Sequence, residues 1–127
     1  MASSDFTQLP DLIVHIEQVV FMPNISTSIE KPYGFVYFLS IENKTPHTVQ
    51  LMARKWIVRE EGAVTLVVEG EGIVGEKPRI EPGDSFSYNS CHIIGANAVA
   101  EGAFFGVIEG EGRKIRTAIP QFKLSIP

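Results

Sequence analysis

The feature that most constrains this chain is a succession of segments in which apolar side chains recur at every second position. Such alternation places apolar residues on one face of a β-strand and polar residues on the other. No segment shows a sustained helical period, because the one candidate, 96–100, is too short. The pattern therefore predicts an all-β protein. The predicted strands are 12–21, 33–43, 49–59, 64–68, 85–92, 103–108 and 115–126.

Proline, glycine and asparagine mark the turns between these segments. The clearest turns are at residues 43–46, 60–62, 81–84 and 109–112. About seven strands joined in this way predict an antiparallel β-sandwich of the immunoglobulin or fibronectin-III type. A closed β-barrel is the structural alternative. In the sandwich, Trp56 is expected to fill the space between the two sheets.

The phase of each alternation predicts which side chains share one face of their strand. These sets are Leu12, Val14, Ile16 and Val20; Phe35, Tyr37, Leu39 and Ile41; and Arg54, Trp56 and Val58; Phe86 and Tyr88 are expected to point inward. The last segment changes phase by one residue at Pro120. Because proline cannot donate a hydrogen bond to a neighbouring strand, a bulge or an edge position is expected there.

A chain of 127 residues fits one domain. Residues 1–10 are polar and end in a proline, so we expect a flexible tail followed by a single sandwich domain over 11–127. Lysine and arginine total 11 and aspartate and glutamate total 15, a net charge of −4. This balance argues against a dedicated nucleic-acid binder.

Compartment and membrane contact are inferred from what the sequence lacks. The single cysteine, Cys91, excludes an internal disulfide. The opening residues show no signal-peptide pattern, and apolar runs stay far below the ~18 residues of a membrane span. We therefore expect a cytoplasmic protein without a membrane partner.

Residues 70–75 read G-E-G-I-V-G, a literal match to the G-x-G-x-x-G pattern of dinucleotide-binding folds. In those folds a helix follows the glycines, and its free N–H groups bind the pyrophosphate. Here Pro78, Pro82 and Gly83 follow and argue against a helix. The favoured interpretation is a structural turn in which the glycines adopt positive φ angles.

An anion-binding interpretation of the same loop is the alternative. The candidate binding residues are Gly70, Gly72, Gly75, Lys77 and Arg79. The glycines would let the backbone approach pyrophosphate or a phosphate-rich nucleotide, and the two cations would supply positive charge. Three glutamates in the same stretch oppose this interpretation, because they would repel phosphate.

The sequence shows no catalytic or metal-binding constellation. His15, His47 and His92 are scattered and lack zinc-ligand spacing. Ser90, Cys91 and His92 are adjacent in sequence, which is not how a catalytic triad is assembled in space. We therefore expect a protein that is not an enzyme, with no catalytic residue, metal ligand or cofactor.

Several blocks of residues, taken in order, resemble the ApaG family. They are F-V-Y-F-L-S-I-E-N from residue 35, V-Q-L-M-A-R-K-W-I-V from 49, E-G-E-G-I-V-G from 69, P-R-I-E-P-G-D-S-F-S-Y-N-S from 78 and I-P-Q-F-K-L-S-I-P from 119. The resemblance covers residues 12–127. Cys91 and His92 depart from the family pattern, which has small residues at those positions.

The resemblance implies a fibronectin-III-like sandwich and no established reaction. The family has been linked to cobalt resistance and magnesium efflux, and related domains occur in proteins whose role is interaction with other proteins. We therefore expect a protein-interaction module with an unidentified protein partner, or a homodimer formed through an edge strand, connected with cobalt or magnesium homeostasis. Binding of a small phosphate ligand or of a divalent cation is the alternative.

Overall fold

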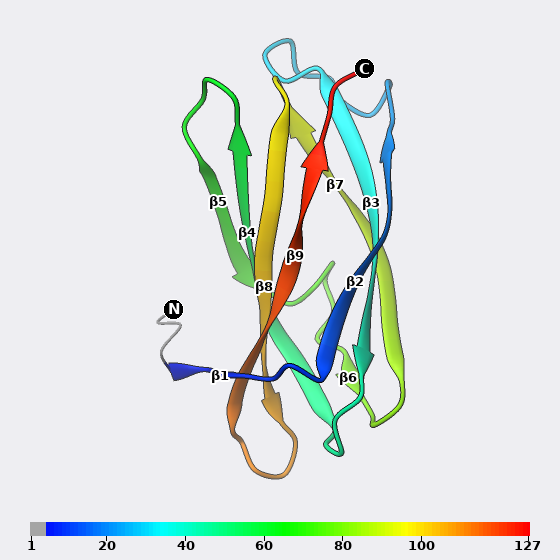
Figure 1. Ribbon diagram of the computed structural model, residues 1–127, viewed down its shortest axis with the longest axis vertical. Coiled ribbons are helices and arrows are strands. Elements are labelled where there is room, and N and C mark those ends of the chain that lie inside the picture. The colour runs from blue at the N-terminus through cyan, green and yellow to red at the C-terminus, as the bar shows by residue number, and fades with distance from the viewer. Residues whose placement is uncertain (1–4) are drawn as a thin grey trace.

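The alternating segments form two β-sheets that pack face to face, as the computed structural model shows for residues 5–127 (Figure 1). The strands are β1 (Thr7–Gln8), β2 (Leu12–Phe21), β3 (Tyr33–Asn43), β4 (Val49–Glu60), β5 (Leu66–Glu71), β6 (Arg79–Ile80), β7 (Ser85–Ile94), β8 (Ala98–Ile108) and β9 (Lys114–Leu124). The larger sheet has the order β1-β9-β8-β4-β5, with β6 paired to β4, and the smaller sheet has the order β2-β3-β7. The predicted sandwich is confirmed, and the barrel alternative is wrong because the two sheets stay separate. Among the described residues, no helix is long and apolar enough to cross a membrane.

The core lies between the two sheets, where the alternation predicted it. The inward residues of β3, from Phe35 to Ile41, are all buried. Trp56 of β4 is only 3% exposed and packs on Tyr37 of β3, with the ring centroids 4.9 Å apart. The tryptophan thus bridges the two sheets, as expected.

Three register shifts interrupt the strand pairing; one lies in β4 between Leu51 and Ala53, and the other two bear on the sequence predictions. In β2 the register shifts between Ile16 and Gln18, so Val19 and Phe21 pack against the core. The prediction that Val20 shares a face with Leu12, Val14 and Ile16 is therefore wrong, because the bulge reverses the faces beyond it. The slip predicted at Pro120 is confirmed: in the pairing of β8 with β9 the register shifts opposite this proline.

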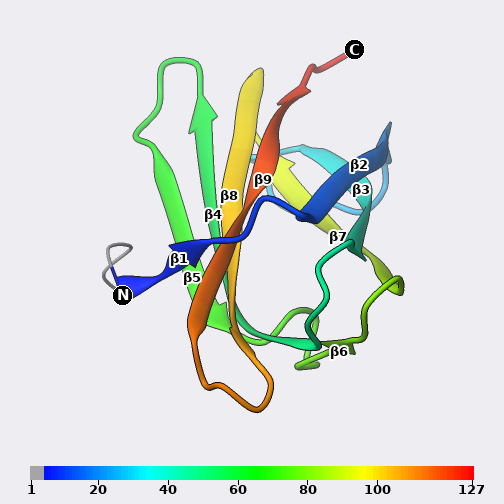
Figure 2. The same cartoon turned by 60° about the horizontal axis from the view of Figure 1, so that its bottom comes forward.

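The N-terminal segment differs from the flexible tail expected over residues 1–10, of which 1–4 lie outside the described residues. Thr7–Gln8 pairs in parallel with β9, which extends the larger sheet beyond the residue where the domain was expected to begin (Figure 2). Phe6 packs edge-on against Phe105, with the ring centroids 4.9 Å apart. Phe6 covers a small apolar cluster on the outer face of this sheet. Burial of its ring there favours attachment of the N-terminal segment to the sheet.

One buried amide joins three parts of the sandwich at one end. The Asn43 side chain, which is 0% exposed, donates from Nδ2 to the carbonyl oxygens of His47 (2.7 Å) and Ile80 (2.8 Å). Its Oδ1 accepts hydrogen bonds from the backbone N–H and the hydroxyl of Thr45. Asn43 therefore links the end of β3 to the following turn and to β6.

Candidate functional site

The glycine-rich loop is a tight backbone turn. Ile73 and Glu76 exchange two backbone hydrogen bonds, of 2.7 and 3.1 Å, around Val74 and Gly75. The φ angles of Val74 and Gly75 are both positive, 51° and 79°, as in a type I′ turn. Gly72 also has a positive φ, and a Cβ atom there would lie 2.8 Å from the carbonyl oxygen of Glu76. Gly72 and Gly75 thus take backbone conformations that favour glycine.

The structure does not bring the five candidate anion-binding residues to one site. Gly70 lies within β5, beside the Arg54 side chain. Lys77 Nζ lies 3.8 Å from a carboxylate oxygen of Glu71. Arg79 donates two hydrogen bonds, of 2.5 and 2.6 Å, to the Glu109 carboxylate, and this contact holds the pKa of Glu109 below its usual value. Both cations therefore already face carboxylates.

Three backbone N–H groups of the loop already have acceptors within the protein. The N–H groups of Gly72, Ile73 and Glu76 all donate to backbone carbonyl oxygens within the protein. An anion-binding nest needs successive N–H groups that converge on the ligand. Pyrophosphate binding through the Gly70–Arg79 loop stays a prediction from the sequence, without support from this geometry.

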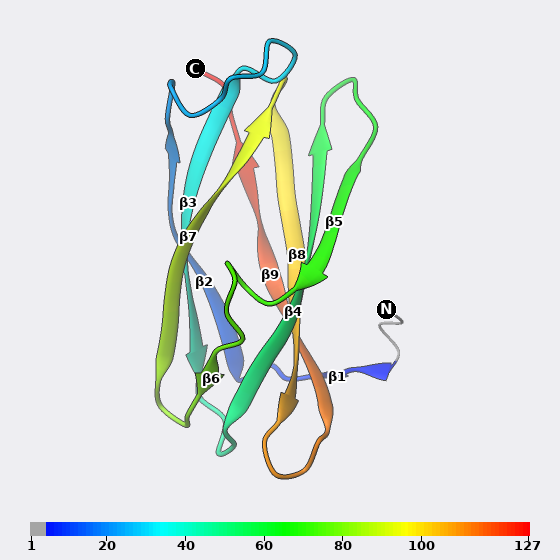
Figure 3. The ribbon, with the colours of Figure 1, turned by 180° about the vertical axis from the view of Figure 1, so that it is seen from behind.

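A second feature is the outer edge of β5, which we call the β5 edge and define as Leu66, Val67 and Val68. β5 pairs with β4 on one side and is the last strand of its sheet (Figure 3). The three residues are 43%, 52% and 37% exposed. Charged side chains, which normally protect such an edge from pairing with other chains, begin only at Glu69.

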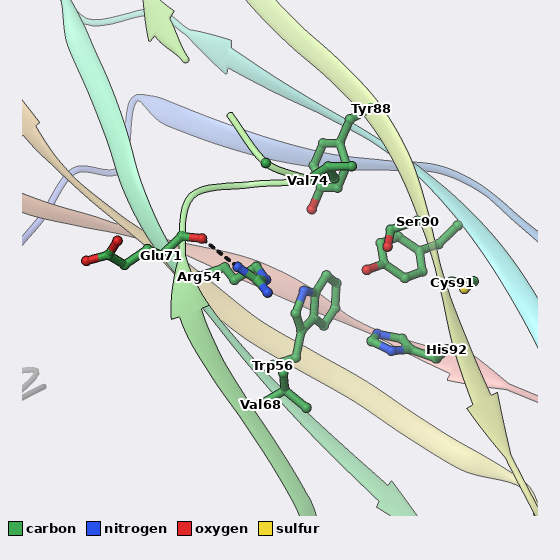
Figure 4. Close-up of a pocket in the computed structure, with 11 residues that line it drawn as sticks. Arg54, Trp56, Val68, Glu71, Val74, Tyr88, Ser90, Cys91 and His92 are labelled. Atoms are coloured by element: carbon green, nitrogen blue, oxygen red, sulfur yellow. Dashed lines mark hydrogen bonds between the residues drawn. The ribbon is translucent and has the colours of Figure 1, made fainter. Parts of the chain in front are cut away.

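The third feature is a cleft of about 380 Å³ between the two sheets, on the side where β5 and β7 face each other (Figure 4). Its aromatic wall consists of Tyr37, Trp56 and His92, whose ring centroids lie 4.8–4.9 Å apart in each pair. Arg54 of β4 and Tyr88 of β7 also line it. We call this space the inter-sheet cleft.

Arg54 supplies the positive charge of the inter-sheet cleft. Burial raises the pKa of Tyr37 to about 12, although the Ser90 hydroxyl partly opposes this shift. Burial also raises the pKa of Tyr88 and lowers that of His92 to about 4. At neutral pH the two tyrosines keep their protons and His92 is neutral. The cleft therefore presents a guanidinium above neutral polar rings.

Burial of His92 predicts a loss of stability in mild acid. Its pKa in the folded protein, about 4, lies below the ordinary value of 6.5, so the unfolded chain binds the extra proton first. The free energy of unfolding should therefore decrease as the pH falls from 6.5 to 4, by up to about 3 kcal/mol from this group. Urea unfolding measured across this range checks the expectation.

Two histidine variants separate the effect of His92 on the pH dependence of stability from the effect of the carboxylates. His92→Gln should remove most of the pH dependence between 6.5 and 4, whereas His47→Gln, which changes a partly exposed ring, should retain it. Equal slopes for His92→Gln and the unchanged protein would contradict the assignment.

The sequence did not identify the inter-sheet cleft as a site. The alternation placed Arg54 on the same face of its strand as Trp56, and both residues line the cleft. The available signal for a site was an arginine on the same strand face as a core tryptophan, because a cation beside a core needs a polar partner. What the sequence could not supply is that β7 brings Tyr88 and His92 opposite this arginine.

No group of three or more His, Cys, Asp or Glu side chains in residues 5–127 is placed to hold a metal ion. His15 contacts Glu42 and His47 contacts Glu111, at 3.1 and 3.8 Å, while His92 lies in the cleft. The three histidines therefore have separate surroundings.

Comparison with known proteins places this fold in a family. The ApaG domain (DUF525) matches residues 23–107. Protein ApaG of Proteus mirabilis is 33% identical over 110 residues, 87% of this chain and 88% of that protein, and Protein ApaG of Enterobacter sp. is 32% identical over the same length. The crystal structure of a Bordetella pertussis protein named ApaA has a TM-score of 0.82 at 28% identity, covering 95% of this chain and 98% of that one. The chain therefore belongs to the ApaG domain family.

Proposed function

We propose that this ApaG domain is a non-enzymatic interaction module that binds a partner protein by adding an extended segment of the partner to the β5 edge. The observation that carries the proposal is the run of three exposed aliphatic residues on β5, whose outer edge pairs with no strand in residues 5–127. An edge strand of this kind offers a row of backbone donors and acceptors that another extended chain satisfies.

The side chains of the β5 edge favour an extended apolar segment as the occupant. Val68 lies opposite the inward-facing Trp56 across the β4–β5 pair, whereas Val67 lies opposite Ile57 on the other face. An added strand would therefore find aliphatic contacts on both faces of the sheet. Cross-strand apolar pairs stabilise such pairing, and the backbone hydrogen bonds add affinity.

A homodimer through the same edge is the secondary form of this proposal. Two copies would pair their β5 strands across a two-fold axis, which makes the contact self-complementary. A different protein is the primary form of the proposal, and the test below distinguishes the two occupants.

The test selects short peptides that bind the protein from a random display library. We expect selected peptides to alternate apolar and polar residues, and to protect β5 amide protons from hydrogen exchange. Val67→Lys should weaken their binding by about tenfold, because it places a charge beside the added strand. The matched control is Ile29→Lys, which alters a side chain that is 97% exposed elsewhere on the surface.

Two results would overturn the proposal. Protection of a different strand or loop by the selected peptides would place the interaction elsewhere. A free protein that sediments as a dimer, and becomes monomeric only in Val67→Lys, would assign the edge to a second copy of the chain.

A further inference from the structure

Val74 holds a strained backbone conformation in the glycine-rich turn. Its φ angle is 51°, and among residues 5–127 it is the one residue other than glycine with a positive φ. A β-branched side chain rarely adopts this left-handed region, because the branched side chain crowds the backbone. Burial offsets little of this strain, since Val74 is 57% exposed. Val74 therefore occupies a position of the type I′ turn that favours asparagine or glycine.

The strained turn is a short exposed segment between two anchored residues. Ile73, which precedes it, is 0% exposed and belongs to the core. The carbonyl oxygen of Pro78, which follows it, accepts a hydrogen bond of 2.9 Å from the N–H of Leu51 in β4. Residues 74–76 between these anchors are all exposed. Their hydrogen bonds with the rest of the described chain are the two that Glu76 and Ile73 exchange, so little holds this segment down.

This segment forms part of the wall of the inter-sheet cleft. Val74 and Gly75 line the cleft together with Tyr88 of β7 (Figure 4). The Tyr88 hydroxyl oxygen and His92 Nε2 are buried there without a hydrogen-bond partner among residues 5–127, and Trp56 is 3% exposed. A buried polar atom without a partner destabilises the arrangement that buries it, because it has given up its hydrogen bonds to water. Strain at Val74 and these two atoms thus both disfavour the closed cleft.

We propose that residues 74–76 are a lid on the inter-sheet cleft, and that this lid opens in the folded protein and admits water to the buried polar atoms. Gly75 provides the hinge, since a residue without a Cβ changes its backbone angles at little cost. Opening breaks the two hydrogen bonds between Ile73 and Glu76 and releases Val74 from its strained φ, while Ile73 stays in the core. Because so few contacts break, this opening is a local event that does not require unfolding of the sheets.

Two measurements on the full chain detect the opening. Amide hydrogen exchange, followed by NMR, should show the N–H groups of Ile73 and Glu76 protected at least about 100-fold less than those of the central strand β8, whose exchange requires the larger sheet to unfold. Acrylamide quenching of fluorescence reports access to Trp56, the single tryptophan, which lies in the cleft wall. Quenching should occur under conditions in which the β8 amides remain protected.

Three variants connect the opening to the strain at Val74. Val74→Asn places a residue that suits a type I′ turn, so it should increase the protection of the lid amides by about tenfold and decrease the rate of Trp56 quenching by at least about threefold. Val74→Ile retains a β-branched side chain and should behave like the unchanged protein. Val64→Asn makes the same change at a valine that is 92% exposed and has no positive φ, and it should alter neither measurement.

Three outcomes would overturn the proposal. Equal protection of the lid amides and the β8 amides would show that the lid does not open by itself. Greater protection of the lid amides in Val74→Asn with unchanged quenching of Trp56 would show that the turn moves without controlling access to the cleft. Equal effects of Val74→Asn and Val64→Asn would show that strain at Val74 does not favour opening.

Discussion

Replacing Asn43 with aspartate is expected to lower the free energy of unfolding by about 4 kcal/mol. The change removes the Nδ2 donor that serves the carbonyl oxygens of His47 and Ile80. It also places a carboxylate at a position that is 0% exposed, facing those two carbonyl oxygens. Urea unfolding at neutral pH, followed by circular dichroism, measures the loss.

Asn97 offers a matched control for this substitution. Its Oδ1 accepts a hydrogen bond of 2.8 Å from the backbone N–H of Ile126. Asn97 is exposed, and aspartate keeps an oxygen in the accepting position. Asn97→Asp should therefore change stability by less than about 0.5 kcal/mol. A loss in Asn43→Asp no larger than that in Asn97→Asp would show that the buried donor does not support this end of the sandwich.

The second large effect is expected from Gly102→Ala in β8. A Cβ atom at this position would lie 2.0 Å from the carbonyl oxygen of Lys55 in the neighbouring strand β4. Because the obstacle is backbone, β8 and β4 would have to separate at the point where their hydrogen bonds join the larger sheet. We expect a loss of about 3 kcal/mol or more, measured by the same urea unfolding.

Gly62→Ala distinguishes this clash from the general effect of replacing a glycine. Gly62 lies in the turn between β4 and β5 with a φ of 70°, and no atom beyond its two chain neighbours lies within 4 Å of the position of its missing Cβ. Alanine there should cost only the strain of a left-handed conformation, about 1–2 kcal/mol. Equal losses in the two variants would show that close strand approach at Gly102 is not limiting.

The β-strands and their core faces could be predicted because short segments of the sequence carry the pattern that determines them. Period-two alternation in 33–43 directs Phe35, Tyr37, Leu39 and Ile41 to one face, and all four are buried. The slip at Pro120 was also visible, because proline interrupts a strand in a known way. The bulge in β2 was not visible, since no proline or glycine marks it and only pairing with β3 fixes its position.

The candidate sites could be predicted only in part. The glycine pattern correctly indicated positive φ angles, because Gly72 and Gly75 both adopt them and glycine carries no Cβ that would oppose this conformation. The sequence could not show that Arg79 pairs with Glu109, which lies 30 residues further along the chain. Nor could it show that β5 ends its sheet, because strand order depends on pairing between distant segments.

The sequence by itself thus determined the all-β class, the inward position of Trp56 and the turn chemistry of the glycine loop. Each of these follows from a periodicity or a backbone preference that a short segment carries alone. Only the tertiary structure decided that β5 stays unpaired at its outer edge and that Arg54, Tyr88 and His92 line one cleft. Both features depend on which strands become neighbours in and between the sheets, and the spacing of residues along the chain does not fix this.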